Sequence, residues 1–249
     1  NDHLDWHGNM NNYLSSKLKI FRLQSKNHYA LANKRFKKIF LEKNYLSKFI
    51  IPNYKKFKKI KSKIKNNYLI SNINDENMKF VYTFSKLLKI KDSDFIHAMK
   101  SFKGLSHRFE FFFNRKNVFF INDSKATTFV ATKSALSSLK NIYWILGGLP
   151  KKGDKISLSK YKKNIIKCYL IGKNINFFKN QIKGKLVYTI TKNLKNSVIR
   201  ILKDIKLKKN IEINVLLSPA AASYDQFKNF EQRGQIFKKL CKFYGRKYI

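Results

Sequence analysis

Short apolar segments alternate with amphipathic ones through the C-terminal part of this 249-residue chain, from about residue 99 to residue 249. The apolar segments, such as Ile142–Leu146 and Ile165–Ile171, contain few polar positions, which is typical of strands buried on both faces. The alternation therefore predicts an α/β fold with a doubly wound, mostly parallel sheet. The predicted elements are a hairpin of strands 109–113 and 118–121, helix 125–139, strand 142–146, strand 165–171, helix 174–182, strand 185–188, helix 194–205, strand 211–217 and helix 229–243.

The N-terminal part, about residues 1–98, has a mixed pattern. Residues 11–24 have a helical period, with Tyr13, Leu14, Leu18 and Phe21 on one face, and residues 29–32 are a short strand candidate. Residues 34–70 are rich in lysine and give no firm assignment. The run Lys55–Lys61 within them is interpreted as a solvated strand edge or loop.

Two further helices are predicted before the C-terminal part begins. The first covers residues 76–90, and the second is expected to begin at a cap formed by Asp92-Ser93-Asp94, to continue through Phe102 and to end at Lys103-Gly104. The side chains expected to face inward from the first of these helices are Phe80, Val81, Phe84, Leu87 and Leu88.

The formal charge of +40 suggests a polyanionic partner, but the composition weakens that interpretation. Lysine outnumbers arginine and is spread along the whole chain, together with abundant isoleucine, asparagine and phenylalanine. The codons of an AT-rich genome would give this mixture without selection for nucleic-acid binding. No zinc-finger, RNA-recognition or basic-zipper pattern is present, so we expect a solvated basic surface and no specific nucleic-acid partner.

Cysteine content and hydropathy favour a reducing, cytoplasmic setting. Cys168 and Cys241 fit no metal-ligand spacing, and two cysteines are too few for a disulfide framework. No signal-peptide pattern opens the chain, and no apolar run is long enough to span a bilayer, so no membrane partner is expected. The first residue is Asn1 and not Met, which suggests a fragment.

Three polar segments follow predicted strands. Ser218–Ser223 brings small residues and hydroxyl groups between a strand and a helix, an arrangement that suits a carboxylate or phosphate. Asn122–Thr127 carries a carboxylate, an ammonium and two hydroxyls, although Asp123 or Ser124 could instead be an ordinary helix N-cap. Gly147–Asp154 has the glycine spacing of a phosphate loop but lacks its Lys-Ser/Thr pair. Three such strand ends together predict an anion site better than any one of them.

Several motifs resemble the Mur ligase family, and among its members most closely those that add D-glutamate. GLSHRFE at 104–110, NDSKAT at 122–127 and LLSPAAASYDQFKNF at 216–230 resemble the family's C-terminal domain in order and spacing. DHLDWHGNMNNYLSSKLKIF at 2–21 resembles the late part of its central ATPase domain. The resemblance implies a Rossmann-like C-terminal domain over 104–249, preceded over 1–103 by the C-terminal portion of the ATP-binding domain.

The resemblance also implies roles for individual residues. His3 matches a magnesium-binding histidine, and Lys17 matches a lysine whose carbamate supplies an anionic oxygen ligand, although from the residues alone Lys17 is a surface lysine of a helix. The positions that match nucleotide contacts are Asn74, Arg108 and Asp123, and those near the reacting groups are His107 and Lys125. The positions that match the D-glutamate site are Thr127, Lys151, Ser223, Tyr224 through its backbone and Phe230 through its backbone N–H.

The chemistry implied by the resemblance is ATP-driven amide formation with Mg²⁺. ATP converts the carboxylate of UDP-N-acetylmuramoyl-L-alanine to an acyl phosphate, which the amine of D-glutamate attacks, in peptidoglycan synthesis that supports cell shape and division. The enzyme is expected to be a cytoplasmic monomer. Other ligases of the Mur or folylpolyglutamate type, or a basic non-catalytic nucleic-acid-binding protein, are the alternatives.

The chain departs from the family pattern at several positions. Ser106 replaces the usual proline of the linker motif, and Ile73 replaces a histidine beside the adenine site, which puts one nucleotide contact in doubt. The family's uridine-binding domain and glycine-rich phosphate loop are expected before Asn1. Because these elements would supply half of the ATP site, we expect the isolated chain to be inactive as a ligase.

Overall fold

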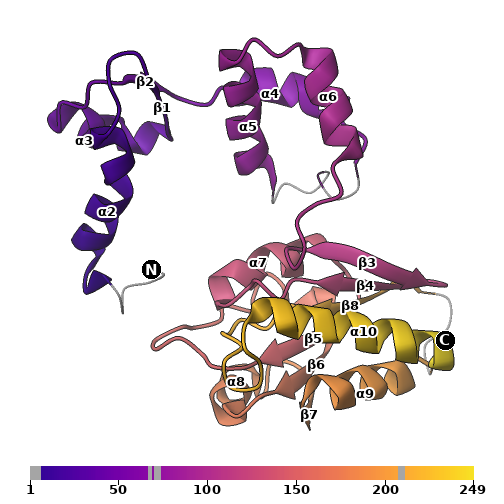
Figure 1. Cartoon of the computed structure of the whole chain (residues 1–249). Helices are drawn as coiled ribbons and strands as arrows, with labels where there is room; N and C mark the ends of the chain where they lie inside the picture. Colours follow the sequence, from indigo (N-terminus) through magenta and orange to yellow (C-terminus); the bar gives the residue numbers. More distant parts are fainter. Residues whose placement is uncertain (1–6, 67–68, 70–73, 207–210) are drawn as a thin grey trace. The chain divides into compact units, whose positions relative to one another are not determined.

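The computed structural model describes residues 7–66, 69, 74–206 and 211–249 (Figure 1). The chain divides into two compact units, Asn1–Phe102 and Lys103–Ile249. Within the described ranges, no helix is long and apolar enough to cross a membrane. Both cysteines are buried and carry free thiols.

The C-terminal unit contains a six-stranded sheet in the order β3-β4-β8-β5-β6-β7. Only β3 runs antiparallel to its neighbour β4, and every other pairing is parallel. The predicted α/β fold with a mostly parallel sheet is therefore confirmed. The elements are β3 (Glu110–Arg115), β4 (Val118–Asn122), α7 (Phe129–Ser138), β5 (Ile142–Gly147), η3 (Lys162–Asn164), β6 (Ile165–Ile171), α8 (Ile175–Ile182), β7 (Tyr188–Lys192), α9 (Leu194–Lys206), β8 (Ile213–Leu217) and α10 (Phe230–Tyr248).

Helices cover both faces of this sheet, which explains why its central strands are apolar throughout. Every residue of β5 and β8 is buried. On one face, α9 and α10 lie side by side over the strands, and their buried side chains share a core with Tyr143 and Tyr169 (Figure 1). On the other face, Phe178 of α8 contacts Phe129 of α7 with ring centroids 6.0 Å apart. The sheet is thus the middle layer of three.

Several element boundaries in the C-terminal unit differ from the prediction, and two of these differences have a clear local cause. Helix α7 begins at Phe129 and not at 125, because Thr128 is its N-cap and accepts a hydrogen bond from the backbone of Ala131 at 3.2 Å. The alternative that Asp123 or Ser124 caps this helix is therefore wrong. Strand β7 begins at Tyr188, where the predicted strand 185–188 ends, because a turn that follows α8 occupies Lys185 and Leu186.

The N-terminal unit consists of short helices and one pair of parallel strands. Asn9 caps the helix Met10–Arg22, because its side chain accepts a hydrogen bond of 2.9 Å from the backbone N–H of Asn12. Strands β1 and β2 pair in register through Tyr29↔Lys48 and Leu31↔Ile50. The elements are α2 (Met10–Arg22), β1 (Tyr29–Leu31), η1 (Lys34–Phe36), α3 (Lys37–Glu42), β2 (Lys48–Ile50), α4 (Tyr54–Lys61), α5 (Asp75–Leu87) and α6 (Asp92–Ser101).

The run Lys55–Lys61 lies in a helix, α4, so its interpretation as a strand edge or loop is wrong. Asn53 caps this helix, and Phe57 and Ile60 are buried on its inner face. The spacing of three between those two apolar residues is helical, and the lysines occupy the solvated face.

The inward face predicted for α5 is also wrong. Met78 and Tyr82 are buried, whereas Val81 and Phe84 are 48% and 53% exposed. The small cluster that α5 joins, with Phe57 of α4, covers only one stripe of the helix. The predicted cap of α6 is absent as well, because Lys91 takes the N-cap position and makes no side-chain cap bond.

Candidate functional site

Three neighbouring strands, β4, β8 and β5, bring their carboxyl ends to one edge of the sheet. The backbone of Asp123 donates to the carbonyl of Leu217 at 2.8 Å, and Gly147 donates to Pro219 at 2.9 Å. Leu149 and Ala222 exchange two backbone hydrogen bonds of 2.9 Å. The predicted convergence of the three polar segments is therefore confirmed.

Asp123 is held at this edge, between the ends of β4 and β8. Its Oδ2 accepts a hydrogen bond from the Ser218 hydroxyl at 2.7 Å, and its Oδ1 accepts one from the backbone of Phe109 at 3.1 Å. Burial raises the pKa of Asp123 to about 7, while these two donors and the charge of Arg108 oppose that rise. Arg108 itself is exposed. The carboxylate is fixed in place and is at the same time costly to ionise.

The free energy of unfolding should fall as the pH rises from about 4 to about 7. In this range the carboxyl of Asp123 is ionised in the unfolded chain but still protonated in the folded chain. Because the pKa of Asp123 is about 7 in the fold against 3.8 ordinarily, the folded chain keeps a proton between these values that the unfolded chain has lost. Between pH 4 and pH 7, the wild type should lose at least about 1.4 kcal/mol of unfolding free energy relative to Asp123→Asn, the equivalent of one pKa unit. Urea unfolding across this range measures the difference.

The matched control for that measurement is Asp94→Asn, on an exposed position of α6. It should show no such divergence from the wild type. Because His107 is present in the wild type and in both variants, comparing each variant with the wild type at every pH removes its contribution. Parallel pH profiles for the wild type and Asp123→Asn would contradict the raised pKa.

His107 faces the interior of the unit. Its ring Nδ1 lies 2.9 Å from the side-chain amide of Asn122, and its backbone N–H donates to Glu110 at 2.9 Å. Burial lowers the pKa of His107, which favours the neutral ring. A Cβ added at Gly234 would lie 2.1 Å from Nδ1, so α10 packs directly against the imidazole. The ring therefore holds α10 against β4, and its predicted place near reacting groups stays a prediction.

The first turn of α10 lies beside the segment that follows β4. The ammonium of Lys125 lies 3.8 Å from the ring centroid of Phe230, within cation–π range. The hydroxyl of Ser124 donates to the carbonyl of Phe230 at 2.8 Å. Asn229 caps the helix by accepting from the backbone of Gln232 at 2.8 Å. The predicted positions 125 and 230 are thus in direct contact.

The remaining predicted D-glutamate positions come from the loops that follow the three strands. Ser223 is 2% exposed, and its carbonyl accepts from the backbones of Gln226 and Phe227. The side chain of Tyr224 is 71% exposed, as expected for a residue predicted to act through its backbone. Thr127 and Lys151 are half-buried, and burial lowers the pKa of Lys151.

The predicted magnesium ligands are only partly described. His3 lies outside the described residues. Lys17 is exposed on α2, with its ammonium 5.4 Å from the ring centroid of Tyr13. Asn74 directly precedes α5 in the same unit. In the part of the chain that the structure describes, no three His, Cys, Asp or Glu residues are placed to hold a metal ion.

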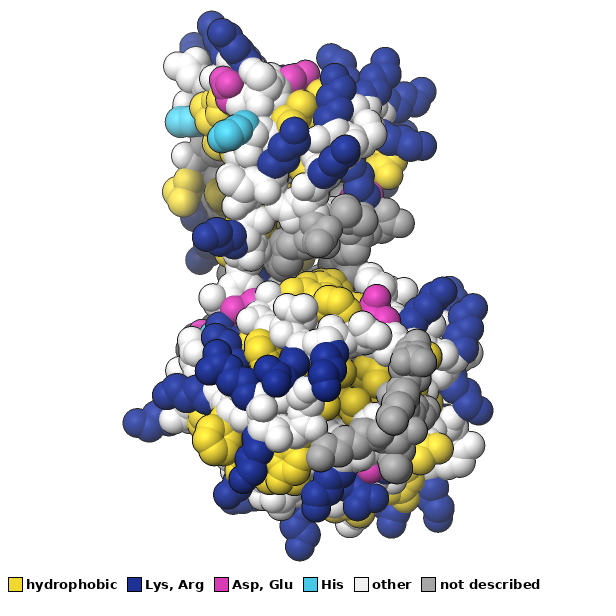
Figure 2. All heavy atoms as spheres, turned by 90° about the vertical axis from the view of Figure 1, so that its right-hand side faces the viewer, with side chains coloured by type: hydrophobic (Ala, Val, Ile, Leu, Met, Phe, Trp, Pro, Cys, Tyr) yellow, Lys and Arg dark blue, Asp and Glu magenta, His cyan; other side chains and the backbone are white. Residues whose placement is uncertain are grey.

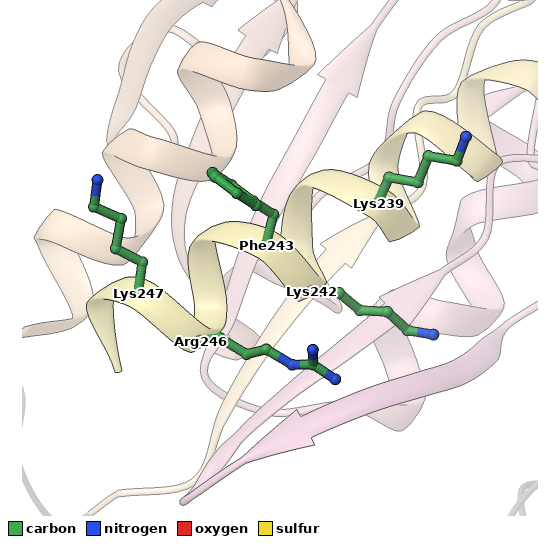
Figure 3. Close-up of a pocket in the computed structure, with 5 residues that line it drawn as sticks. All are labelled: Lys239, Lys242, Phe243, Arg246 and Lys247. Atoms are coloured by element: carbon green, nitrogen blue, oxygen red, sulfur yellow. The ribbon is translucent and has the colours of Figure 1, made fainter.

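A surface hollow elsewhere on α10 does not qualify as a site. Its lining side chains project from this one helix, and flexible lysines dominate it (Figure 3). Figure 2 shows lysine and arginine side chains scattered over the face in view, on both units. This scatter fits the expected solvated basic surface. The lining residues are Lys239, Lys242, Phe243, Arg246 and Lys247.

Comparisons with known proteins point to the same family as the sequence motifs. No family model matches the chain. The chain is 34% identical to the UDP-N-acetylmuramoylalanine–D-glutamate ligase of Rickettsia prowazekii, over 97% of the chain and 59% of that protein. It is 33% identical to the enzyme of the same name from Rickettsia bellii, over 96% of the chain and 58% of that protein. The chain thus spans less than two thirds of the length of these relatives.

Solved structures of low sequence identity share the fold. MurF from Acinetobacter baumannii superposes with a TM-score of 0.66 at 11% identity, over 96% of this chain and 57% of that one. UDP-N-acetylmuramate-alanine ligase MurC from Thermotoga maritima gives a TM-score of 0.50 at 16% identity, over 71% of this chain and 39% of that one.

Proposed function

Because the chain belongs to the Mur ligase family, we propose that it carries the C-terminal part of a UDP-N-acetylmuramoylalanine–D-glutamate ligase. The observation that supports this most directly is the convergence of the segments after β4, β5 and β8 at one edge of the sheet. The family motifs NDSKAT and SPAAASYDQFKNF lie in two of these segments. The proposed process is peptidoglycan synthesis.

The proposed ligand of this edge is the dicarboxylate D-glutamate. Lys151 contributes positive charge, and Thr127 and Ser223 contribute hydroxyl groups. The hydroxyl of Ser223 makes no hydrogen bond within the described residues, so it is available to a ligand. The N–H of Phe230 lies in the first turn of α10, where a helix provides no internal acceptor and favours an anion.

The proposed nucleotide contacts of the C-terminal unit are Arg108 and Asp123. For the N-terminal unit, taken by itself, the proposed nucleotide contact is Asn74. The carboxyl group of Asp123 suits the hydroxyls of a ribose, and the exposed guanidinium of Arg108 suits a phosphate. Lys17 as a carbamate and His3 are proposed to hold Mg²⁺. Of these two proposed ligands, only Lys17 lies among the described residues. No step of the reaction is therefore assigned to Mg²⁺.

In the proposed reaction, ATP phosphorylates the carboxylate of UDP-N-acetylmuramoyl-L-alanine, and ADP leaves. The amine of D-glutamate then attacks the acyl carbon and forms the C–N bond of a tetrahedral intermediate. This intermediate loses the amine proton to solvent and expels phosphate as its C–O bond breaks, which leaves the amide. The residues of this chain hold the amine in line with that carbon, and the Lys125 ammonium offsets negative charge nearby. Positioning and electrostatics are thus the proposed contribution of the C-terminal unit.

Titration of the 249-residue chain with D-glutamate tests the amino-acid site. In nitrogen-15 correlation spectra, D-glutamate should shift amides of residues 122–127, 147–154 and 218–230, because the ligand would contact these segments. L-Glutamate and the amino acids used by related ligases, lysine and diaminopimelate, should bind at least about tenfold more weakly, since they misplace or lack one hydrogen-bonded carboxylate. Equal shifts from all four would contradict the proposal.

A further inference from the structure

Arg233 is fully buried and joins two of the three loops at the sheet edge. Its Nε donates to the Ser124 hydroxyl at 2.9 Å, and its Nη2 donates to the carbonyls of Ser124 and Ala221 at 2.8 and 3.0 Å. One rigid guanidinium thus bridges the loop after β4 and the loop after β8. A buried arginine with three such acceptors fixes their separation.

The same contacts close both ends of the segment that connects β8 to α10. Arg233 reaches back from α10 to hold Ala221 near the start of the segment. Ser124, which receives the bond from Arg233, donates to the carbonyl of Phe230 at its end. Ser223 and the backbone of Tyr224 lie between these two points. The shape of that segment therefore depends on a residue outside it.

The third loop lies against the same guanidinium. A Cβ added at Gly148 would lie 3.3 Å from Nη1 of Arg233, so the loop after β5 passes close to it. Nη1 has no hydrogen-bond partner in the part of the chain that the structure describes. No carboxylate contacts the guanidinium among those residues, and Asp225 acts on its charge only at longer range. Carbonyl and hydroxyl oxygens therefore stabilise the guanidinium at Nε and Nη2, without an ion pair among the described residues.

We propose that Arg233 is a positioning residue for the amino-acid site, and that its hydrogen bonds set the spacing between the Ser223 segment and the loop after β4. The inference rests on the proposed function for the identity of the ligand. The structural reason is geometric, because the donors of a lysine diverge from one atom and cannot reproduce the planar fork. Arg233 does not touch the ligand in this arrangement, since its side chain is fully buried.

Hydrogen exchange and D-glutamate binding by the 249-residue chain test this role. In Arg233→Met, exchange in residues 122–128 and 218–230 should rise at least about tenfold, and D-glutamate affinity should fall by a similar factor, because the loops lose a multiply bonded cross-link. Arg233→Lys should recover part of each loss. Strands β6 and β7 should exchange as in the wild type. D-Glutamate binding is compared at a temperature well below the thermal unfolding midpoint of each variant.

The matched controls are Arg246→Met and Arg246→Lys, at an exposed position of the same helix, which should change neither readout. Ser124→Ala removes the two hydrogen bonds of the Ser124 hydroxyl and keeps both bonds from Nη2 of Arg233, and it serves if Arg233→Met does not fold. The inference would be overturned if amide exchange in both loops of the Arg233 variants stayed at the wild-type rate. It would also be overturned if the exchange rate rose equally across the whole C-terminal unit. Failure of the wild-type chain to bind D-glutamate would instead refute the proposed function, and hydrogen exchange would still decide the role of Arg233.

Discussion

Replacing Gly147 with alanine is expected to lower the unfolding free energy of the C-terminal unit by about 3–5 kcal/mol. The new Cβ would lie 2.1 Å from the carbonyl oxygen of Ile171 and 2.9 Å from its carbonyl carbon. Both are backbone atoms of the neighbouring strand β6, which pairs with β5 at this position and cannot yield without breaking the ladder. The φ of Gly147 is +134°, which a residue with a side chain rarely adopts.

Gly153→Ala is the matched control for Gly147→Ala. It adds the same methyl group in the loop that follows β5, at a positive φ of +74°, but meets nothing within 4 Å. Backbone strain alone should cost about 1 kcal/mol there. Urea unfolding followed by tryptophan fluorescence suits the comparison, because buried Trp144 lies on β5. Equal losses in the two variants would show that backbone strain, and not contact with β6, governs both.

The fold of the C-terminal unit could be predicted because its central strands are buried on both faces. Such strands require continuous apolar runs, and β5 and β8 are recognisable in the sequence for that reason. The sequence pattern of the N-terminal helices predicts their buried faces less well. These helices carry more apolar residues than their small core can bury, so Val81 and Phe84 of α5 remain exposed although they lie on an apolar stripe.

Part of the candidate site could also be predicted. Parallel strands place their carboxyl ends at one edge, so the convergence of three polar segments follows from the element order. The burial and fixed position of the Asp123 carboxyl could not be predicted from the sequence, because its hydrogen-bond donors Ser218 and Phe109 come from distant parts of the chain. Arg233 was missed entirely. From the sequence alone, a single arginine on a helix is expected at the surface, because only the tertiary structure shows which buried acceptors it reaches.

Ser223→Ala is expected to weaken D-glutamate binding by about 10- to 100-fold while leaving the fold intact. A hydroxyl that donates to a carboxylate contributes about 1.5–3 kcal/mol, and alanine leaves that carboxylate oxygen without a donor at a position that is only 2% exposed. The fold should survive because the local turn uses the backbone, with the Ser223 carbonyl accepting from Gln226 and Phe227. Calorimetric titration of the wild-type and variant chains with D-glutamate measures the loss.

Ser137→Ala is the control for Ser223→Ala, since it removes a hydroxyl from an exposed position of α7 where that hydroxyl donates only to the carbonyl of Ser134. Its D-glutamate affinity should match that of the wild type. Amide exchange in residues 218–230 should also stay at the wild-type level in Ser223→Ala, in contrast to Arg233→Met. This difference separates a residue that contacts the ligand from one that shapes the pocket. Unchanged affinity in Ser223→Ala would remove Ser223 from the proposed site and leave the positioning role of Arg233 to be judged by exchange alone.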